Sequence, residues 1–218
     1  MFGSDDFSKT GPDGRLPRPL RGFSHINRYW DKTTNHYAAK ILPGQYYVTM
    51  HGEMIATVLG SCISACVRDT VFGIGGMNHF MLPMESGGGS SNETWNSEAT
   101  RYGNFAMEAL INDILKAGGR KENLEIKVFG GANVLENATT VGERNIAFVH
   151  TFIKTEGFTL AGEDMGDIYP RKVQYYPQTG KVRMMKLREM HNRTIIERED
   201  NYRDSLKNEP IAGDIDLF

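Results

Sequence analysis

The hydrophobic positions of this 218-residue chain change their spacing along its length. Short apolar runs rich in β-branched and aromatic residues, bounded by glycine and turn residues, are typical of strands. The run over 62–68 is apolar on both faces and therefore predicts a buried strand. The complete set of expected strands is 45–50, 55–59, 62–68, 71–81, 124–129, 158–168, 173–176 and 182–187.

Three stretches instead repeat their apolar residues at helical spacing. The first follows Ser97, a residue type favoured at helix N-caps, and stops at the Gly118-Gly119 pair. The second covers 143–156, and the third, which is mostly charged, covers 194–207. Strands and helices alternate in the middle of the chain, and strands gather at both ends. This order predicts an α/β fold with α+β character, built in layers.

Irregular segments flank the predicted main domain, which covers 37–190. Proline and glycine interrupt any period over 1–36, so we expect an irregular N-terminal extension there. Residues 191–218 form a polar C-terminal tail with room for the third helix. Within the main domain, the glycine- and serine-rich stretch 85–96 predicts a loop.

Composition narrows the class of protein. Lys and Arg together number 25 against 27 Asp and Glu, so the chain lacks the basic excess of a nucleic-acid-binding protein. Its apolar runs are too short for a membrane span, and its first residues lack the apolar core of a secretory signal. Cys62 and Cys66 would lie about 13 Å apart along a strand, too far for a disulfide. We therefore expect a protein of the reducing cytoplasm.

The candidate chemistry lies at Cys62 and His79. Gly60-Ser61 precedes the cysteine, and the stretch 75–78 before the histidine begins with two glycines. A thiol is strongly nucleophilic only as the thiolate, and a nearby imidazole can take its proton. Glycine turns leave backbone N–H groups free to stabilise an oxyanion. If the two residues begin and end adjacent strands, strand pairing brings them within reach of each other.

Both residues also have a structural interpretation. Buried cysteines commonly just pack, and Cys66 between Ala65 and Val67 fits that interpretation. A histidine in an apolar stretch is often a core residue. From residue chemistry alone, the catalytic and the packing interpretations of Cys62 are equally supported. A zinc site of Cys62, Cys66 and His79 is disfavoured because its spacing is unusual and a fourth ligand is missing. We expect no metal and no cofactor.

A third group should orient the imidazole or the substrate. The candidates are Thr57, Ser61 and Asn78, although Thr57 is equally an ordinary β-branched strand residue. Farther along, Gly130-Gly131 follows a predicted strand without the Lys-Ser/Thr of a phosphate-binding loop. That pair predicts a turn in which two backbones approach closely.

Four motifs, in this order, resemble the CheD family, the chemoreceptor glutamine deamidases of bacterial chemotaxis. The motifs are TVLGSC at 57–62, GGMNHFMLP at 75–83, KVFGGAN at 127–133 and GERN at 142–145. The resemblance runs from about residue 45 to about residue 187. It implies that 37–190 is a deamidase catalytic domain. It also implies a layered β-rich sandwich with flanking helices, similar to the catalytic domain of the deamidating cytotoxic necrotising factor toxins.

The resemblance further implies a hydrolase that converts selected glutamines of methyl-accepting chemotaxis proteins to glutamate through a thioester. In this family pattern Cys62 is the nucleophile, His79 the general base and Thr57 the third residue. Gly60, Ser61 and Asn78 complete the expected substrate and oxyanion site. A phosphatase of the CheC type is an expected partner. We expect no nucleic-acid partner and no direct insertion into a membrane.

Two other functions stay open from the sequence. A non-catalytic module could bind receptors or a CheC-type phosphatase and so modulate signalling. A cysteine hydrolase of another kind, such as an esterase or a peptidase, would use similar chemistry. The presence of both Cys62 and His79 favours an enzyme over a purely binding module.

Overall fold

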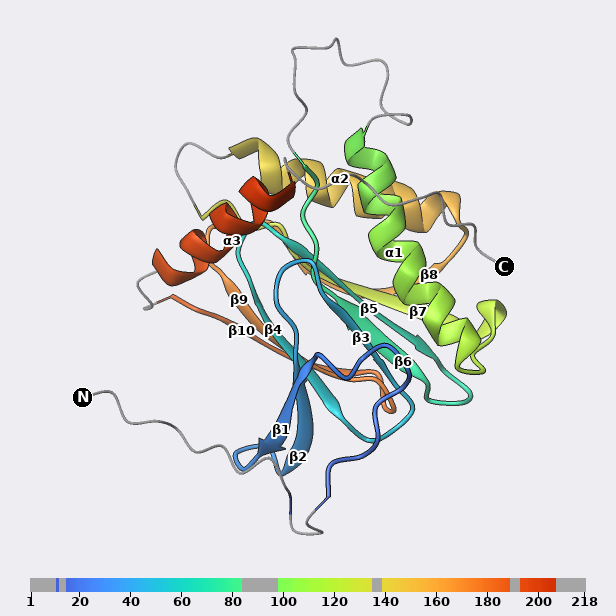
Figure 1. Cartoon of the computed structure of the whole chain (residues 1–218). Helices are drawn as coiled ribbons and strands as arrows, with labels where there is room; N and C mark the ends of the chain where they lie inside the picture. The colour runs from blue at the N-terminus through green and yellow to red at the C-terminus, as the bar shows by residue number, and fades with distance from the viewer. Residues whose placement is uncertain (1–10, 12–14, 84–97, 135–138, 189–192, 207–218) are drawn as a thin grey trace, which may run out of the picture.

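The computed structural model describes residues 11, 15–83, 98–134, 139–188 and 193–206. These residues form ten strands, three α-helices and one 3-10 turn (Figure 1). The strands are β1 (Asn27–Asp31), β2 (His36–Lys40), β3 (Tyr46–Thr49), β4 (Met54–Leu59), β5 (Ile63–Asp69), β6 (Gly75–Asn78), β7 (Leu124–Gly130), β8 (Thr159–Met165), β9 (Arg171–Tyr176) and β10 (Lys181–Lys186). The helices are α1 (Glu98–Lys116), α2 (Thr139–Thr155) and α3 (Arg193–Leu206), with the 3-10 turn η1 at Lys121–Asn123.

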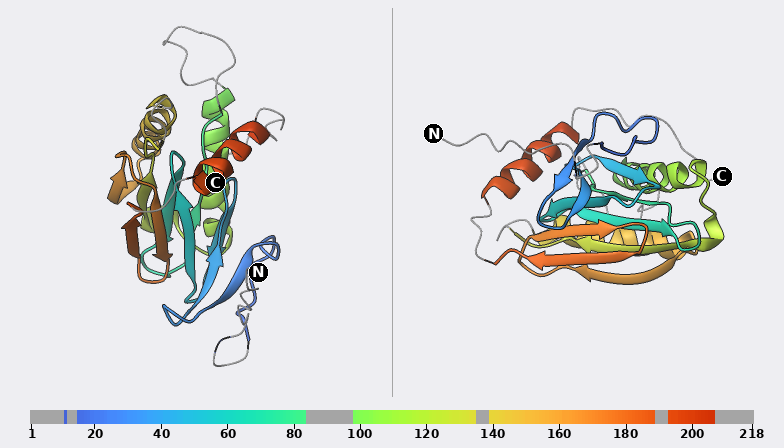
Figure 2. Two further views of the ribbon diagram at one scale, coloured as in Figure 1. Left: turned by 90° about the vertical axis from the view of Figure 1, so that its left-hand side faces the viewer. Right: turned by 90° about the horizontal axis from the view of Figure 1, so that it is seen from below.

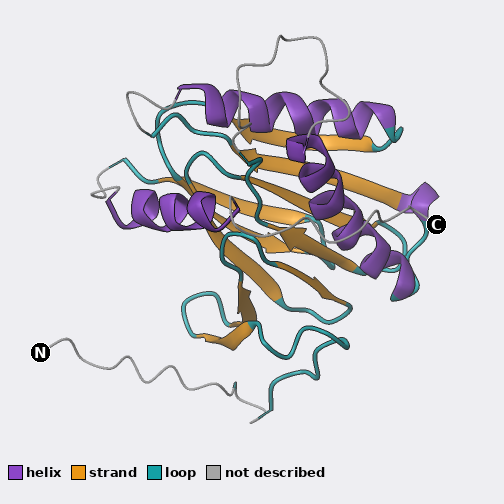
Figure 3. Cartoon of the chain, turned by 45° about the horizontal axis from the view of Figure 1, so that its top comes forward, coloured by secondary structure: helices purple, strands orange, loops and turns teal. Residues whose placement is uncertain are grey.

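The strands form two five-stranded mixed sheets, in the orders β1-β2-β4-β9-β10 and β3-β6-β5-β7-β8. Helix α1 packs on β3, β5 and β6, and α2 packs on β5 and β8, so both cover the second sheet. Figure 3 shows these two helices lying over the strands. The prediction of a layered α/β sandwich with flanking helices is confirmed. The likeness to the toxin domain stays a prediction.

The core fills the space between the layers, as the pattern over 62–68 predicts. Strand β5 lies in the middle of the second sheet, between β6 and β7, and nearly all of its residues are buried. Each large apolar side chain buried in this way contributes about 1.5–3 kcal/mol. Several expected elements differ in extent, and β2 is not among the expected strands. Strand β6 is shorter than the expected 71–81, because the backbone turns before Gly75, and α2 begins earlier than residue 143.

The prediction of an irregular extension over 1–36 is wrong for its last part, where Asn27–Asp31 forms β1. This strand pairs antiparallel with β2 and is held to the body by Arg28, which donates two hydrogen bonds to Glu53 at 2.6 and 2.9 Å. Tyr47 and Thr49 donate to the other oxygen of that carboxylate. This network joins residues far apart in the chain, so local patterns could not reveal it.

Helix α3 confirms the helix expected in the polar tail. In the right-hand view of Figure 2 it lies to the left and α1 to the right, and the hydroxyls of Tyr202 and Tyr102 join the two helices. A groove runs between α3 and the N-terminal strands, lined by residues that include Asn27, Lys40 and Tyr202. None of the described helices is long and apolar enough to cross a membrane. The expected loop over 85–96 and the end of the tail lie outside the described residues.

Candidate active site

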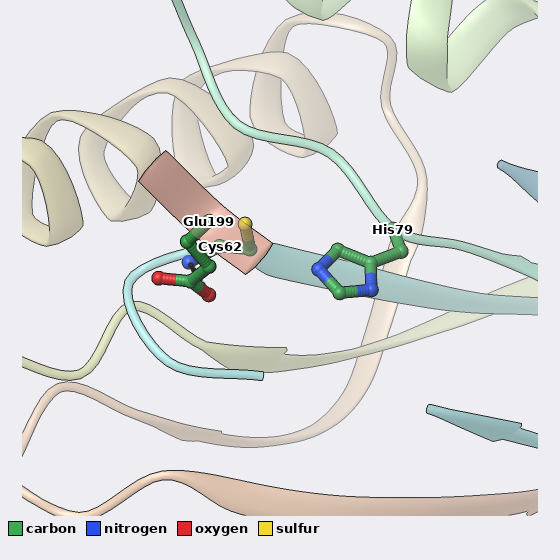
Figure 4. Close-up of side chains that lie close together, drawn as sticks. All are labelled: Cys62, His79 and Glu199. Carbon is green, nitrogen blue, oxygen red and sulfur yellow. Dashed lines mark hydrogen bonds between the residues drawn. The ribbon is translucent and has the colours of Figure 1, made fainter. Parts of the chain in front are cut away.

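Strand pairing brings Cys62 and His79 together. Strands β5 and β6 are antiparallel neighbours, and Ile63 bridges Phe80 beyond the end of β6. Cys62 directly precedes β5 and His79 directly follows β6, so both lie at the same end of the pair. A ring nitrogen of His79, the Cys62 sulfur and an oxygen of Glu199 lie within 4.8 Å of one another (Figure 4). The expected proximity of cysteine and histidine is therefore present.

Thr57 sets the protonation of the imidazole. Its hydroxyl lies 2.9 Å from the carbonyl oxygen of Ile41, to which it donates its only proton. The same hydroxyl lies 2.8 Å from Nδ1 of His79 and must therefore accept a hydrogen bond from a protonated Nδ1. Nε2 is left with a lone pair, is buried, and has no hydrogen-bond partner among the described residues. In Figure 4 this nitrogen points toward Cys62, as a general base for the thiol requires.

The contact that orients the His79 ring thus joins the two sheets. Thr57 belongs to β4 of the first sheet, whereas His79 follows β6 of the second. The threonine that orients the ring and the ring itself meet where the two sheets face each other. Their relative position consequently depends on how the whole sandwich packs.

Beside Cys62 and His79, which we call the dyad, the backbone of residues 60–62 forms an anion-binding site. The N–H groups of Gly60 and Cys62 donate to one oxygen of Glu199, at 2.8 and 3.2 Å. The N–H and hydroxyl of Ser61 donate to the other oxygen, at 2.8 and 2.7 Å. An added Cβ at Gly60 would lie 2.8 Å from the carboxylate, so any larger residue there would push Glu199 away from its present position. Converging N–H groups of this kind stabilise oxyanions.

Three anchors hold those N–H groups in place. The carbonyls of Gly60 and Cys62 accept hydrogen bonds from Ala132 and Gly131, both at 2.8 Å. The Ser61 carbonyl accepts one from the side chain of Asn145 on α2, also at 2.8 Å. The close-approach turn predicted at Gly130-Gly131 is confirmed, because a Cβ at Gly130 would lie 2.1 Å from the Cys62 carbonyl oxygen. With each carbonyl bound on one side, the N–H groups face the site.

Asn145 is a functional candidate that the sequence analysis missed. Its carboxamide oxygen accepts from the N–H of Leu82 at 2.9 Å while its NH₂ group holds Ser61. It therefore ties the loop before β5 to the segment after β6. The signal was present, because Asn145 closes the GERN motif, but nothing local indicates what it contacts.

Burial controls the protonation of the dyad. Cys62 is fully buried, and burial, reinforced by the negative charge of Glu199, raises the pKa of its thiol. Burial also lowers the pKa of His79 to about 3. The pair at rest is therefore a neutral thiol beside a neutral imidazole.

Glu199 is the second residue that sequence analysis missed. It belongs to α3, whose buried side chains Ile195, Glu199 and Leu206 follow helical spacing. An acid within the apolar stripe of an amphipathic helix is the signal that could have indicated it. Its burial needs partners, and the N–H groups of residues 60–62 supply them.

A metal ion does not fit this cluster well. Cys62, His79 and Glu199 have ligand atoms close enough for one. However, both oxygens of Glu199 already accept hydrogen bonds, and three backbone N–H groups point into the site. Positive ends of N–H dipoles favour an anion over a cation. The zinc site weighed from the sequence included Cys66. Among the described residues, the third group with a ligand atom near Cys62 and His79 is Glu199 and not Cys66.

Two other candidate residues, Asn78 and Cys66, make contacts within the protein core. The side chain of Asn78 accepts from the N–H of Ala65 at 2.8 Å and donates to the carbonyl of Ala106 at 3.0 Å, so it holds α1 on the sheet. These contacts do not bring it to the 60–62 loop. Cys66 packs in the hydrophobic core, and both cysteines are free thiols, as expected from their spacing.

Comparison with known proteins agrees with these motifs. Residues 81–186 match the family model described as CheD, chemotactic sensory transduction. Curated relatives named probable chemoreceptor glutamine deamidase CheD include that of Hahella chejuensis, 52% identical over 93% of this chain and 95% of the relative. Those of Halorhodospira halophila and Methylobacillus flagellatus are 53% and 54% identical over 93% of this chain, and cover 94% and 100% of the relatives. With such identity over nearly its whole length, the chain belongs to the CheD family.

Proposed function

We propose that this protein is a chemoreceptor glutamine deamidase that hydrolyses glutamine side chains of methyl-accepting chemotaxis proteins to glutamate through a thioester on Cys62. One observation carries the proposal. A glutamate carboxylate, the group that this reaction produces, lies in the N–H site of residues 60–62 beside the Cys62 sulfur and His79. The names of the relatives supply the class of substrate.

The first half of the reaction forms the thioester. Nε2 of His79 takes the proton of the Cys62 thiol, and the thiolate attacks the carbon of the substrate carboxamide. The carboxamide oxygen becomes an oxyanion, which the N–H groups of Gly60 and Cys62 stabilise. When the C–N bond breaks, the protonated imidazole returns its proton to the departing nitrogen, and ammonia leaves.

The second half releases the product. Nε2 takes a proton from water, and the resulting hydroxide attacks the thioester carbon. The same N–H groups hold the second oxyanion. When the C–S bond breaks, the sulfur recovers a proton from His79. The product leaves as the carboxylic acid of glutamate, which loses its proton to the solvent or to the released ammonia. Throughout, Thr57 keeps Nδ1 protonated, because its hydroxyl can only accept from that atom.

Two finer expectations belong to the same proposal. The receptors that such an enzyme modifies carry their adaptation sites in the cytoplasm, so we place the enzyme there. A CheC-type phosphatase stays a predicted partner, on the resemblance alone. A binding module without catalysis would need neither the oriented Nε2 nor the N–H site, so both features favour an enzyme.

The test is to incubate the purified protein with a cytoplasmic receptor fragment and map amide-to-acid conversion by peptide mass spectrometry. We expect conversion at discrete glutamines by the wild type and none by Cys62→Ala. Cleavage of the fragment's backbone would indicate a peptidase. If neither occurs with several receptors although the protein binds them, the binding module is the better hypothesis.

A further inference from the structure

Helix α3 places a product-like group in the site. Glu199 is only 5% exposed, and its two oxygens accept hydrogen bonds from the backbone of Gly60, Ser61 and Cys62 and from the Ser61 hydroxyl. A glutamate side chain is also what hydrolysis of a substrate glutamine leaves behind. The chain therefore presents to its own active site the chemical group that the reaction generates on another protein.

The rest of α3 shows how such a group can be delivered. Ile195 and Leu206, on the same stripe as Glu199, are buried. The ring of Tyr202 packs against Gly44, and its hydroxyl forms a short hydrogen bond with that of Tyr102. The surface under α3 thus accepts one helix with apolar side chains on either side of a central carboxyl. A helix that bears a glutamine at the central position has the same shape.

While α3 is in place, the site cannot act. Glu199 fills the N–H site that an oxyanion would need, and its carboxylate lies beside the Cys62 sulfur. The negative charge there adds to burial in raising the pKa of the thiol. A cavity next to His79 is closed on one side by Ile195, Arg198 and Glu199 of the same helix. Substrate and α3 therefore exclude each other.

We propose that α3 covers the substrate-docking surface as a built-in product mimic, and that a helix carrying the target glutamine must displace it. The inference rests on the proposed function for the identity of the substrate. The covering role of the helix is independent of the proposed function, because access to Cys62 can be measured without any deamidation.

The first measurement is the rate at which iodoacetamide alkylates Cys62, followed by peptide mass spectrometry in the full-length chain. Glu199→Gln keeps the size of the side chain but turns an NH₂ group toward backbone N–H donors, so it should release α3. Loss of a charge-assisted hydrogen bond predicts alkylation about tenfold faster or more. Glu197→Gln, at an exposed position of the same helix, is the matched control and should react like the wild type. Cys66, buried in the core, serves as the internal control.

The second measurement is deamidation of a receptor fragment by the same variants. We expect Glu199→Gln to be about tenfold faster than the wild type at low substrate concentration, and Glu197→Gln to be unchanged. If the variant Glu199→Gln melts at a lower temperature than the wild type, the variant Glu199→Ala is measured in its place. Adding a synthetic peptide of residues 193–206 should slow Glu199→Ala again, and the same peptide with glutamine at position 199 should inhibit less.

The outcomes separate the two proposals. Faster alkylation without deamidation by any variant would support the covering role of α3 and overturn the proposed function. Alkylation of both Glu199 variants at the wild-type rate would overturn the product mimic. Slower deamidation by well-folded Glu199 variants would also overturn it, because Glu199 would then assist the reaction.

Discussion

Cys62 and Cys66 lie four residues apart at the start and in the middle of one buried stretch, yet their surroundings differ in kind. Both side chains are at most 1% exposed, and burial raises the pKa of both thiols. Cys62 meets an unpaired imidazole nitrogen and a set of backbone N–H groups. Cys66 lies within the hydrophobic core, opposite Met77 of β6.

The difference teaches that burial alone does not decide what a cysteine does. A buried thiol stays protonated unless a base can take the proton and nearby dipoles can stabilise the negative charge that follows. Only the strand end at Cys62 offers both, because the chain leaves the regular ladder there and its N–H groups turn toward the site. Within the regular ladder around Cys66, the N–H groups are used by strand pairing.

Exchanging the two thiols for alanine should give the largest contrast. Cys62→Ala removes the nucleophile, and we expect deamidation of a receptor fragment to fall by about a thousandfold or more. Cys66→Ala removes only core packing, so activity should persist while the free energy of unfolding falls by about 1–2 kcal/mol. Activity assays and urea unfolding of both variants check this. Equal loss of activity in two folded variants would break the comparison.

Loosening the loop beside Cys62 should have the next largest effect. Asn145→Asp keeps the oxygen that accepts from Leu82 but loses the NH₂ group that holds the Ser61 carbonyl. Because the N–H groups would no longer be held in position, we expect kcat to fall about a hundredfold. Asn145→Ala, which loses both contacts, should be at least as slow and also less stable. An unchanged kcat in Asn145→Asp would show that the anchor is dispensable.

Removing the hydroxyl that orients His79 should cost less. Thr57→Val preserves the shape of the side chain but leaves Nδ1 without its acceptor, so the proton can move to Nε2 and the base is lost. We expect kcat to fall about tenfold to a hundredfold, with Thr57→Ser close to the wild type. If Thr57→Val and Thr57→Ser are equally active, the hydroxyl does not set the tautomer.

The smallest effect is on stability at low pH. His79 has a pKa of about 3 in the folded protein because it is buried, against about 6.5 when unfolded. The unfolded chain therefore binds more protons between these values, so stability is lost as pH falls below about 6.5. By pH 5 the loss amounts to about 2 kcal/mol relative to neutral pH. His79→Asn, measured by urea unfolding across the same range, should lack this loss.

The sequence predicts the part of the site that strands determine. Glycine turns before Cys62 and His79, together with the apolar runs beside them, indicate adjacent strands and hence a close pair. A layered α/β fold also follows from the order of the elements, whereas the sandwich comes from the resemblance. Residue chemistry leaves Thr57, Ser61 and Asn78 as candidates for the third group, and the resemblance selects Thr57. The local sequence cannot show its contact with His79, because that contact depends on how two sheets face each other.

Long-range contacts explain what sequence analysis missed. Glu199 reaches the 60–62 loop from the far end of the chain, and Asn145 reaches it from α2. Strand β1 is stabilised by the Arg28–Glu53 pair, which no local period reveals. Asn78 binds Ala65 and Ala106, and its expected role at the substrate stays a prediction.

The most direct test of the central claim is to run the receptor deamidation in hydroxylamine, which intercepts thioesters. If Cys62 carries the γ-glutamyl group, the target glutamines should yield hydroxamate in competition with glutamate. The hydroxamate should also form with Cys66→Ala and be absent with Cys62→Ala. Conversion to glutamate alone at every hydroxylamine concentration, or hydroxamate formed by Cys62→Ala, would contradict the account.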